Sequence, residues 1–142
     1  MKVFLVEDSL MIRALLARTI EAMPVARVVG EAECEEMAIA MIEHSRPDLV
    51  LLDLQLAFGG SGLNVLQRLR RAGFAAPIFV MSNQVIEAYR QAAFGLGADR
   101  FYDKTLDMPR LIDDLGAMQR ATPAVAPAPR EPRRPQELAG LR

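Results

Sequence analysis

Short apolar runs, each about the length of a β-strand, recur along this chain. Four of them are rich in leucine and β-branched residues, and they cover residues 3–6, 27–30, 49–52 and 78–81. A fifth run, at 100–102, is shorter and weaker. Within each run the apolar residues do not alternate with polar ones, which is typical of strands that are buried on both faces of a sheet.

Segments with the helical spacing of apolar residues lie between these runs. The first begins after Ser9, a residue type that caps helices, and ends before Pro24. Later segments follow the other runs, and two of them end at Gly73 and Gly97. This alternation predicts a (βα)5 fold, a doubly wound parallel sheet with helices on both faces. Right-handed crossovers leave few topologies for it, and the strand order that we expect is 2-1-3-4-5. Ligands of such sheets bind beyond the carboxyl ends of the strands, so the candidate site residues are those that follow each strand.

The composition changes near residue 121. Residues 121–142 hold five of the nine prolines and four arginines against two glutamates. We therefore predict one domain over residues 1–120 and a disordered or polyproline-II tail over 121–142. A single cysteine, Cys34, and no evident signal peptide favour a cytoplasmic protein. No apolar stretch reaches the roughly 20 residues that span a bilayer, and the net charge of −1 gives no sign of binding to nucleic acid or membrane.

Acidic residues follow two runs that the predicted strand order makes neighbours. Glu7 and Asp8 come after the first run, and Asp53 comes after the third. Carboxylates that converge repel one another unless they take up protons or bind a cation. Because these ligands are oxygens, without histidine or cysteine, the expected ion is Mg²⁺ or Mn²⁺ rather than zinc. The fourth run delivers Ser82 and the fifth delivers Lys104, which would add a hydroxyl and an ammonium to the pocket.

This set of side chains suits transfer of a phosphoryl group to a carboxylate. Aspartate is a covalent nucleophile for phosphoryl groups, and positioned cations stabilise the charge of the transition state. We expect Asp53 to attack, Lys104 to neutralise a phosphoryl oxygen, and Ser82 to donate a hydrogen bond once the group is in place. The metal ligands would be Glu7, Asp8, Asp53 and the backbone carbonyl of Gln55.

Four pieces of the sequence together resemble the receiver domain of a two-component response regulator, of the single-domain type used in chemotaxis. They are "VEDS" at 6–9, "PDLVLLDLQL" at 47–56, Ser82, and "GADRFYDK" at 97–104. The resemblance implies a flavodoxin-like fold in which a histidine kinase or a phosphotransfer protein phosphorylates Asp53. It also implies the family's acidic pair at Glu7 and Asp8, its lysine at Lys104, its switch hydroxyl at Ser82 and its switch aromatic at Phe101.

The sequence departs from the family pattern in two loops. The segment "LQLAFGGSGLNV" after Asp53 lacks the usual proline and Asp-Gly pair, and its glycines predict a mobile loop. Thr105 follows Lys104 where the family usually has a proline, so we expect a trans peptide bond there. Gln55 and Gln84 stand two residues beyond Asp53 and Ser82, and we predict from this spacing that they set the lifetime of the phosphate.

The residues after the domain are too few for a helix-turn-helix domain, so no direct DNA binding is expected. We predict instead a regulated contact with a downstream protein, or a homodimer, through the fourth helix, fifth strand and fifth helix. Phosphorylation would draw Ser82 toward the phosphate, and Phe101 would rotate into the vacated space. Of the neighbours Phe101 and Tyr102, one is expected to point into the core and one outward.

Four alternatives to this function stay open. The chain could be a phosphate sink or relay intermediate, or a pseudo-receiver that binds partners without phosphate. It could be a small hydrolase of the aspartyl-phosphate type, although no second aspartate stands two residues after Asp53. Finally, the tail could itself be the output segment. The favoured function includes no enzymatic activity beyond self-catalysed phosphoryl transfer and dephosphorylation.

Overall fold

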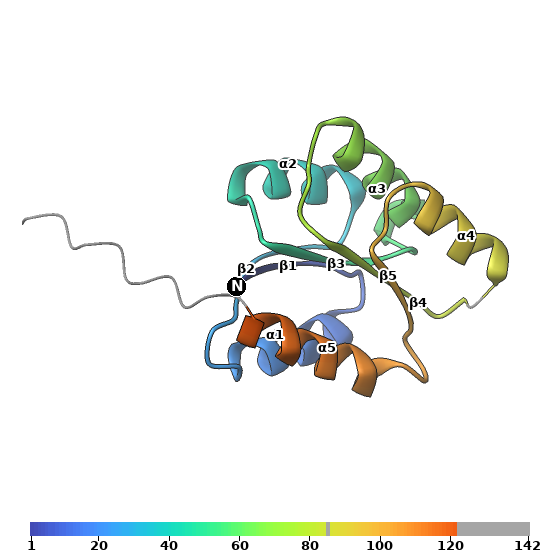
Figure 1. Ribbon diagram of the computed structural model, residues 1–142. Coiled ribbons are helices and arrows are strands. Elements are labelled where there is room, and N and C mark those ends of the chain that lie inside the picture. The colour runs from blue at the N-terminus through green and yellow to red at the C-terminus, as the bar shows by residue number, and fades with distance from the viewer. Residues whose placement is uncertain (85, 122–142) are drawn as a thin grey trace, which may run out of the picture.

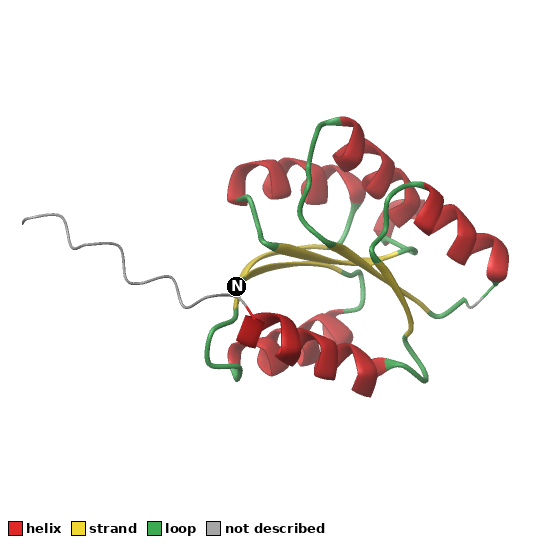
Figure 2. Ribbon diagram, in the orientation of Figure 1, coloured by secondary structure: helices red, strands yellow, loops and turns green. Residues whose placement is uncertain are grey.

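The computed structural model describes residues 1–84 and 86–121 of the chain. A five-stranded parallel sheet with the order β2-β1-β3-β4-β5 lies between two layers of helices (Figures 1 and 2). The strands are β1 (Lys2–Val6), β2 (Arg27–Ala32), β3 (Leu49–Asp53), β4 (Ile78–Ser82) and β5 (Arg100–Asp103). The helices are α1 (Leu10–Glu21), α2 (Glu35–Ser45), α3 (Gly62–Arg71), α4 (Glu87–Gly95) and α5 (Met108–Ala121), with a 3₁₀ turn at Ala57–Gly59. The predicted doubly wound, flavodoxin-like fold and its strand order are confirmed.

Successive apolar side chains of β1, β3, β4 and β5 enter two different cores. On β1, Phe4 and Val6 pack in the core under α2, α3 and α4, whereas Val3 and Leu5 pack in the core against α1 and α5. Figure 1 shows these two helix layers on opposite faces of the sheet. All four side chains are fully buried, so both faces of the strand require apolar residues, and this explains why the apolar runs are continuous.

The structure contradicts the expectation that one of Phe101 and Tyr102 points outward. Both side chains are buried. Phe101 lies in the core of α2, α3 and α4, and Tyr102 lies in the core of α1 and α5. Although β5 is an edge strand, it contacts α4 and α5, which belong to opposite layers. Neither face of this strand is therefore open to solvent at these two residues.

The ends of the elements follow the predicted signals closely. The Ser9 side chain caps α1 by accepting a hydrogen bond from the backbone N–H of Ile12. Gly73 and Gly97, which come after α3 and α4, have positive φ angles of 89° and 104°, a conformation that glycine adopts at low cost. Within the described residues, no helix has both the length and the apolar character that a membrane crossing requires. Of the predicted tail, 121–142, only Ala121 is described, and it is the last residue of α5; residues 122–142 lie outside the described residues.

Candidate functional site

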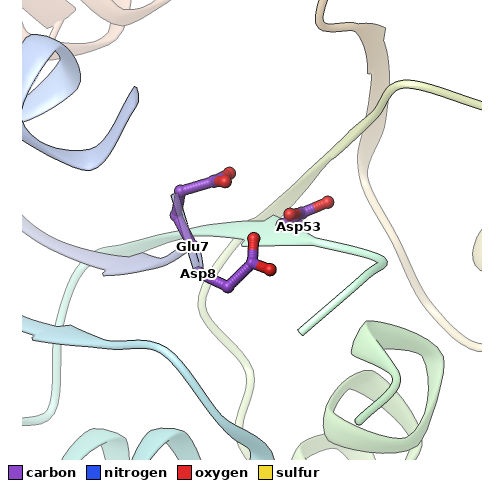
Figure 3. Close-up of side chains that lie close together, drawn as sticks. All are labelled: Glu7, Asp8 and Asp53. Atoms are coloured by element: carbon purple, nitrogen blue, oxygen red, sulfur yellow. The ribbon is translucent and has the colours of Figure 1, made fainter. Parts of the chain in front are cut away.

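The predicted acidic residues meet at the carboxyl edge of the sheet. β1 and β3 are neighbours, with Val6 opposite Leu52, so the residues that follow them come to the same level. Glu7, Asp8 and Asp53 each offer a carboxylate oxygen, and these oxygens lie within 4.8 Å of one another (Figure 3). Glu7 and Asp53 are buried and Asp8 is exposed, so the cluster is open to solvent on the side of Asp8.

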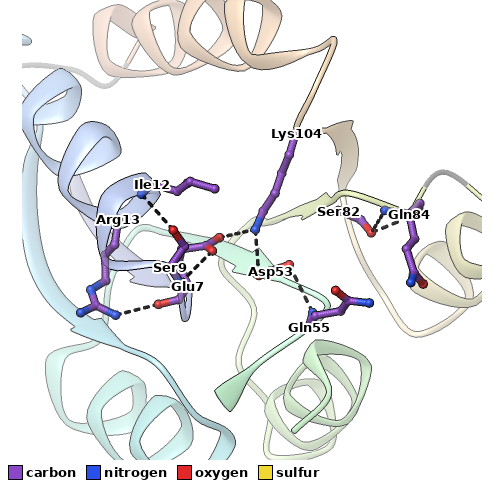
Figure 4. A network of polar contacts seen from close by, with 9 residues as sticks. All are labelled: Glu7, Ser9, Ile12, Arg13, Asp53, Gln55, Ser82, Gln84 and Lys104. Carbon is purple, nitrogen blue, oxygen red and sulfur yellow. Dashed lines mark hydrogen bonds and ion pairs between the residues drawn. The ribbon is translucent and has the colours of Figure 1, made fainter. Parts of the chain in front are cut away.

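Lys104 reaches this cluster from the loop after β5. Its Nζ lies 2.6 Å from Glu7 Oε2 and 2.8 Å from Asp53 Oδ2 (Figure 4). Only 4% of the Lys104 side chain is exposed, so both ion pairs are shielded from water. The Lys104 backbone N–H donates to the Ser82 carbonyl at 3.0 Å, which ties this loop to the end of β4. The peptide bond that leads to Thr105 is trans, as predicted.

Hydrogen bonds to the backbone and side chain of Glu7 hold the end of β1 in place. The guanidinium of Arg13, on α1, donates to the Glu7 carbonyl at 2.7 Å. The Ser9 N–H donates to Glu7 Oε1 at 3.1 Å, and the Glu7 N–H donates to the Ala32 carbonyl at 3.0 Å. Arg13 was not among the predicted site residues. Its place on the first turns of a helix that starts directly after the acidic pair is the signal that could have identified it.

The electrostatics of the cluster favour an added positive charge. Burial raises the pKa of Glu7 from its ordinary 4.5 to about 7, since the hydrogen bond and charge of Lys104 offset only part of that effect and the charge of Asp53 adds to it. Burial also raises the pKa of Asp53, against the opposing effect of Lys104. For Lys104, burial lowers the pKa, but the contacts with Asp53 and Glu7 outweigh burial and raise it overall.

The donor set fits a hard divalent cation. Three carboxylates and one ammonium give the cluster a formal charge of −2, which a divalent cation would cancel. The ligand atoms are all oxygens, and neither sulfur nor imidazole is present in the cluster, as Mg²⁺ and Mn²⁺ prefer. Glu7, Asp8 and Asp53 could therefore hold such an ion at this edge of the sheet.

Ser82 lies on the other side of Asp53 from Glu7 and is engaged with Gln84 (Figure 4). Its Oγ donates to the Gln84 carbonyl at 3.1 Å and accepts from the Gln84 N–H at 3.0 Å. Ser82 also borders a cavity of about 120 Å³ together with Gln55, Gln84 and Tyr89. The side chains of Gln55 and Gln84 are exposed near the site, whereas Phe101 is buried beside α4.

The loop after Asp53 is a defined turn rather than an unrestrained stretch. Gln55 and Ser61 pair across it as an isolated antiparallel bridge, and the Gln55 N–H donates to Asp53 Oδ1 at 3.2 Å. Gly62 begins α3 against the end of β3, where a Cβ atom would lie 2.1 Å from the Asp53 carbonyl oxygen. Only glycine fits this close approach. Gly62 therefore serves packing, whereas Gly59, with a φ of 69°, supplies conformational freedom; the predicted mobility of the loop stays a prediction.

Comparison with known proteins gives one consistent family. Residues 3–116 match the family model described as the response regulator receiver domain. The chain is 34% identical over 113 residues to the nitrate/nitrite response regulator protein NarL of Escherichia coli strain K12, a match that covers 80% of this chain and 52% of NarL. It is 38% identical over 113 residues to protein-glutamate methylesterase/protein-glutamine glutaminase 2 of Shewanella oneidensis, which covers 77% of this chain and 31% of that protein. The chain thus spans about half or less of the length of these curated relatives.

Solved structures give the same result for the fold. A two-component response regulator of the LuxR family from Aurantimonas superposes with a TM-score of 0.76 at 28% identity, covering 84% of this chain and 85% of that one. The response regulator domain of Thermotoga maritima CheB superposes with a TM-score of 0.74 at 22% identity, covering 85% of this chain and 94% of that one.

Proposed function

This chain belongs to the response regulator receiver domains of two-component systems, and on that premise we propose that it is switched by phosphorylation of Asp53 by a histidine kinase or phosphotransfer protein. The observation that carries the proposal is the buried ammonium of Lys104, which lies within 2.8 Å of carboxylate oxygens from both Glu7 and Asp53. A phosphoryl group on Asp53 would therefore lie close to this ammonium. The enzymatic activity in the names of the methylesterase relatives is not part of this proposal.

The transfer is an attack by the Asp53 carboxylate on the phosphorus of a phosphohistidine. A bond forms between an Asp53 oxygen and phosphorus, and the phosphorus–nitrogen bond breaks with its electron pair returning to the imidazole. Lys104 stabilises the charge that spreads over the phosphoryl oxygens. Glu7, Asp8, Asp53 and the Gln55 carbonyl would hold Mg²⁺ or Mn²⁺, and such an ion would supply further positive charge to stabilise the transferring group. The Gln55 N–H, which donates to Asp53 Oδ1, fixes the orientation of the nucleophile.

Ser82 and Phe101 connect the phosphate to the protein surface. To bind a phosphoryl oxygen, the Ser82 hydroxyl must leave its hydrogen bond with the Gln84 carbonyl. The loop after β4 follows, Phe101 turns into the vacated space, and the surface formed by α4, β5 and α5 changes. The exposed side chains of Gln55 and Gln84 flank the site and set how long the phosphate persists.

The changed surface binds a downstream protein or a second copy of the chain in the cytoplasm. The rival role, a phosphate sink or relay intermediate, uses the same site, and return of the phosphoryl group to a histidine distinguishes it. A pseudo-receiver would not need the complete acidic set beside Lys104, which argues against that alternative. Another alternative, output through residues 121–142, is tested by deletion of those residues.

The deciding experiment is incubation with acetyl phosphate and Mg²⁺, followed by measurement of the intact mass. We expect the unaltered chain to gain the mass of one phosphoryl group and Asp53→Ala to gain nothing. Asp113→Ala, which alters an exposed aspartate of α5, is the matched control and should be labelled like the unaltered chain. Equal labelling of Asp53→Ala, or no labelling of the unaltered chain, would refute the proposal.

A further inference from the structure

In the hairpin-like turn after β3, two paired residues direct their backbone N–H and C=O groups to opposite sides. The Gly62 N–H donates to the Leu54 carbonyl at 2.9 Å, and the Leu56 N–H donates to the Gly60 carbonyl at 3.0 Å. Gln55 and Ser61 face each other between these two bonds. In an antiparallel pair of this kind, both residues direct their own N–H and C=O groups away from the opposite leg. The backbone of Gln55 and that of Ser61 therefore face opposite sides of the turn.

The two sides of the turn have different neighbours. On one side the Gln55 N–H donates to Asp53 Oδ1 at 3.2 Å, so the Gln55 backbone faces the acidic cluster. On the other side the Ser61 N–H donates to Glu35 Oε2 at 3.0 Å. Glu35 thus binds Ser61, which lies directly opposite Gln55, the residue whose carbonyl is the expected backbone ligand of the metal.

Further contacts join α2 and the loop before it to the same turn. Glu35 is the first residue of α2 and is half-buried. Its side chain packs over Gly60, where an added Cβ would lie 3.1 Å from both Glu35 Cγ and Glu35 Oε2. The Ala57 N–H donates to the Glu33 carbonyl at 2.9 Å. The turn, which has no proline to stiffen it, is held from outside by the segment that begins α2.

We propose that Glu35 is a positioning residue for the phosphorylation site: through Ser61 it fixes the turn that directs the Gln55 carbonyl at the metal. This inference rests on the proposed metal site. Because Glu35 bonds to Ser61 and is not a member of the carboxylate cluster, its effect passes through backbone geometry rather than through direct contact with the metal. Loss of its hydrogen bond should weaken metal binding without removing any ligand.

Two conservative variants distinguish the effect of the length of the Glu35 side chain from the effect of its charge. Glu35→Asp keeps the negative charge but is one methylene shorter and cannot span the distance to the Ser61 N–H without a shift of the backbone. Glu35→Gln loses the charge but keeps an oxygen that can accept the same hydrogen bond. The matched control is Glu36→Gln, which removes the same charge from the same helical turn, where an 83% exposed side chain pairs with Arg68.

The experiment is titration of the metal-free, unphosphorylated protein with Mn²⁺, with the free ion followed by electron paramagnetic resonance. We expect Glu35→Asp to bind Mn²⁺ roughly three- to tenfold more weakly. This is less than the roughly 10–100-fold effect of losing a group that bonds directly to a metal ligand, because Glu35 acts through Ser61. Glu35→Gln and Glu36→Gln should bind Mn²⁺ within about twofold of the unaltered protein. Each loses one negative charge, but salt screens a charge at a half-buried or exposed position, so the effect on Mn²⁺ affinity is small. Amide hydrogen exchange at Ser61 should become faster in Glu35→Asp and stay slow in Glu35→Gln.

Other results of the Mn²⁺ titration would contradict either the positioning role of Glu35 or the proposed metal site. Weak binding by Glu35→Gln together with normal binding by Glu35→Asp would mean that Glu35 acts by its charge, and the positioning role would be wrong. Equal Mn²⁺ affinity of all four proteins would also overturn it while leaving the metal site intact. No Mn²⁺ binding by the unaltered protein would instead overturn the proposed metal site.

Discussion

Glu7→Gln should stabilise the metal-free protein in a strongly pH-dependent way. The pKa of Glu7 rises from 4.5 to about 7 in the fold, mainly through burial, and each pKa unit corresponds to about 1.36 kcal/mol. The folded protein therefore holds this proton more tightly than the unfolded chain does. The resulting stability is fully present below pH 4.5 and is lost as the pH rises through about 7. Ionised Glu7 then costs the fold about 3 kcal/mol, which the neutral glutamine avoids.

The measurement is urea unfolding with EDTA at pH 5 and pH 8. At pH 8 we expect Glu7→Gln to exceed the unaltered protein by about 3 kcal/mol in the free energy of unfolding, and at pH 5 by less than about 1 kcal/mol. Saturating Mg²⁺ should stabilise the unaltered protein at pH 8 and remove most of the advantage of the variant, since binding to the folded state alone shifts the equilibrium. A variant that is less stable than the unaltered protein at pH 8 in EDTA would refute the reasoning, because the ion pair with Lys104 would then outweigh burial.

Three further substitutions test separate contacts. Lys104→Met leaves two buried carboxylates without their cation, so the free energy of unfolding at pH 8 in EDTA should fall by about 3–5 kcal/mol, and Mg²⁺ should restore part of it. Gly62→Ala places a Cβ 2.1 Å from the Asp53 carbonyl oxygen and should cost about 2–3 kcal/mol in urea unfolding, whereas Gly95→Ala, where a Cβ meets nothing within 4 Å, should cost nothing. Arg13→Ala removes the hydrogen bond to the last carbonyl before Asp8 and should weaken Mn²⁺ binding severalfold; unchanged binding would show that the end of β1 keeps its shape without it.

Periodicity was sufficient to predict most of the fold and the convergence of the site. A parallel sheet buried on both faces requires continuous apolar runs, and the order of such runs along the chain leaves few topologies. Residues that follow parallel strands of one sheet meet at the same edge by geometry alone, which is why the sequence was enough to predict that Glu7, Asp53 and Lys104 lie together.

The contacts that the sequence did not reveal join segments whose spacing carries no periodic signal. The bond from Ser61 to Glu35 links residues that are 26 positions apart, and either residue alone is typical of a helix start. The burial of both Phe101 and Tyr102 depends on where α4 and α5 lie relative to an edge strand, which the local sequence of β5 does not specify. Tertiary packing, rather than propensity, decides such features.

The strength of the proposed switch can be bounded from the contacts of Ser82. Its hydroxyl now donates to a neutral carbonyl, that of Gln84, and such a bond contributes about 1 kcal/mol net. A hydrogen bond to a phosphoryl oxygen is charge-assisted and about twice as strong, so exchanging the Gln84 carbonyl for the phosphoryl oxygen gains about 1 kcal/mol. This free energy changes the ratio of the two conformations roughly fivefold. A nearly complete switch needs several kcal/mol, and the remainder must come from other groups, of which Phe101 is the proposed one. Ser82→Ala should therefore lower the ratio of active to inactive conformation in the phosphorylated protein about fivefold, without abolishing the response, as measured by the chemical shifts of α4 and β5 amides. Complete loss of the response would mean that Ser82 alone drives the switch.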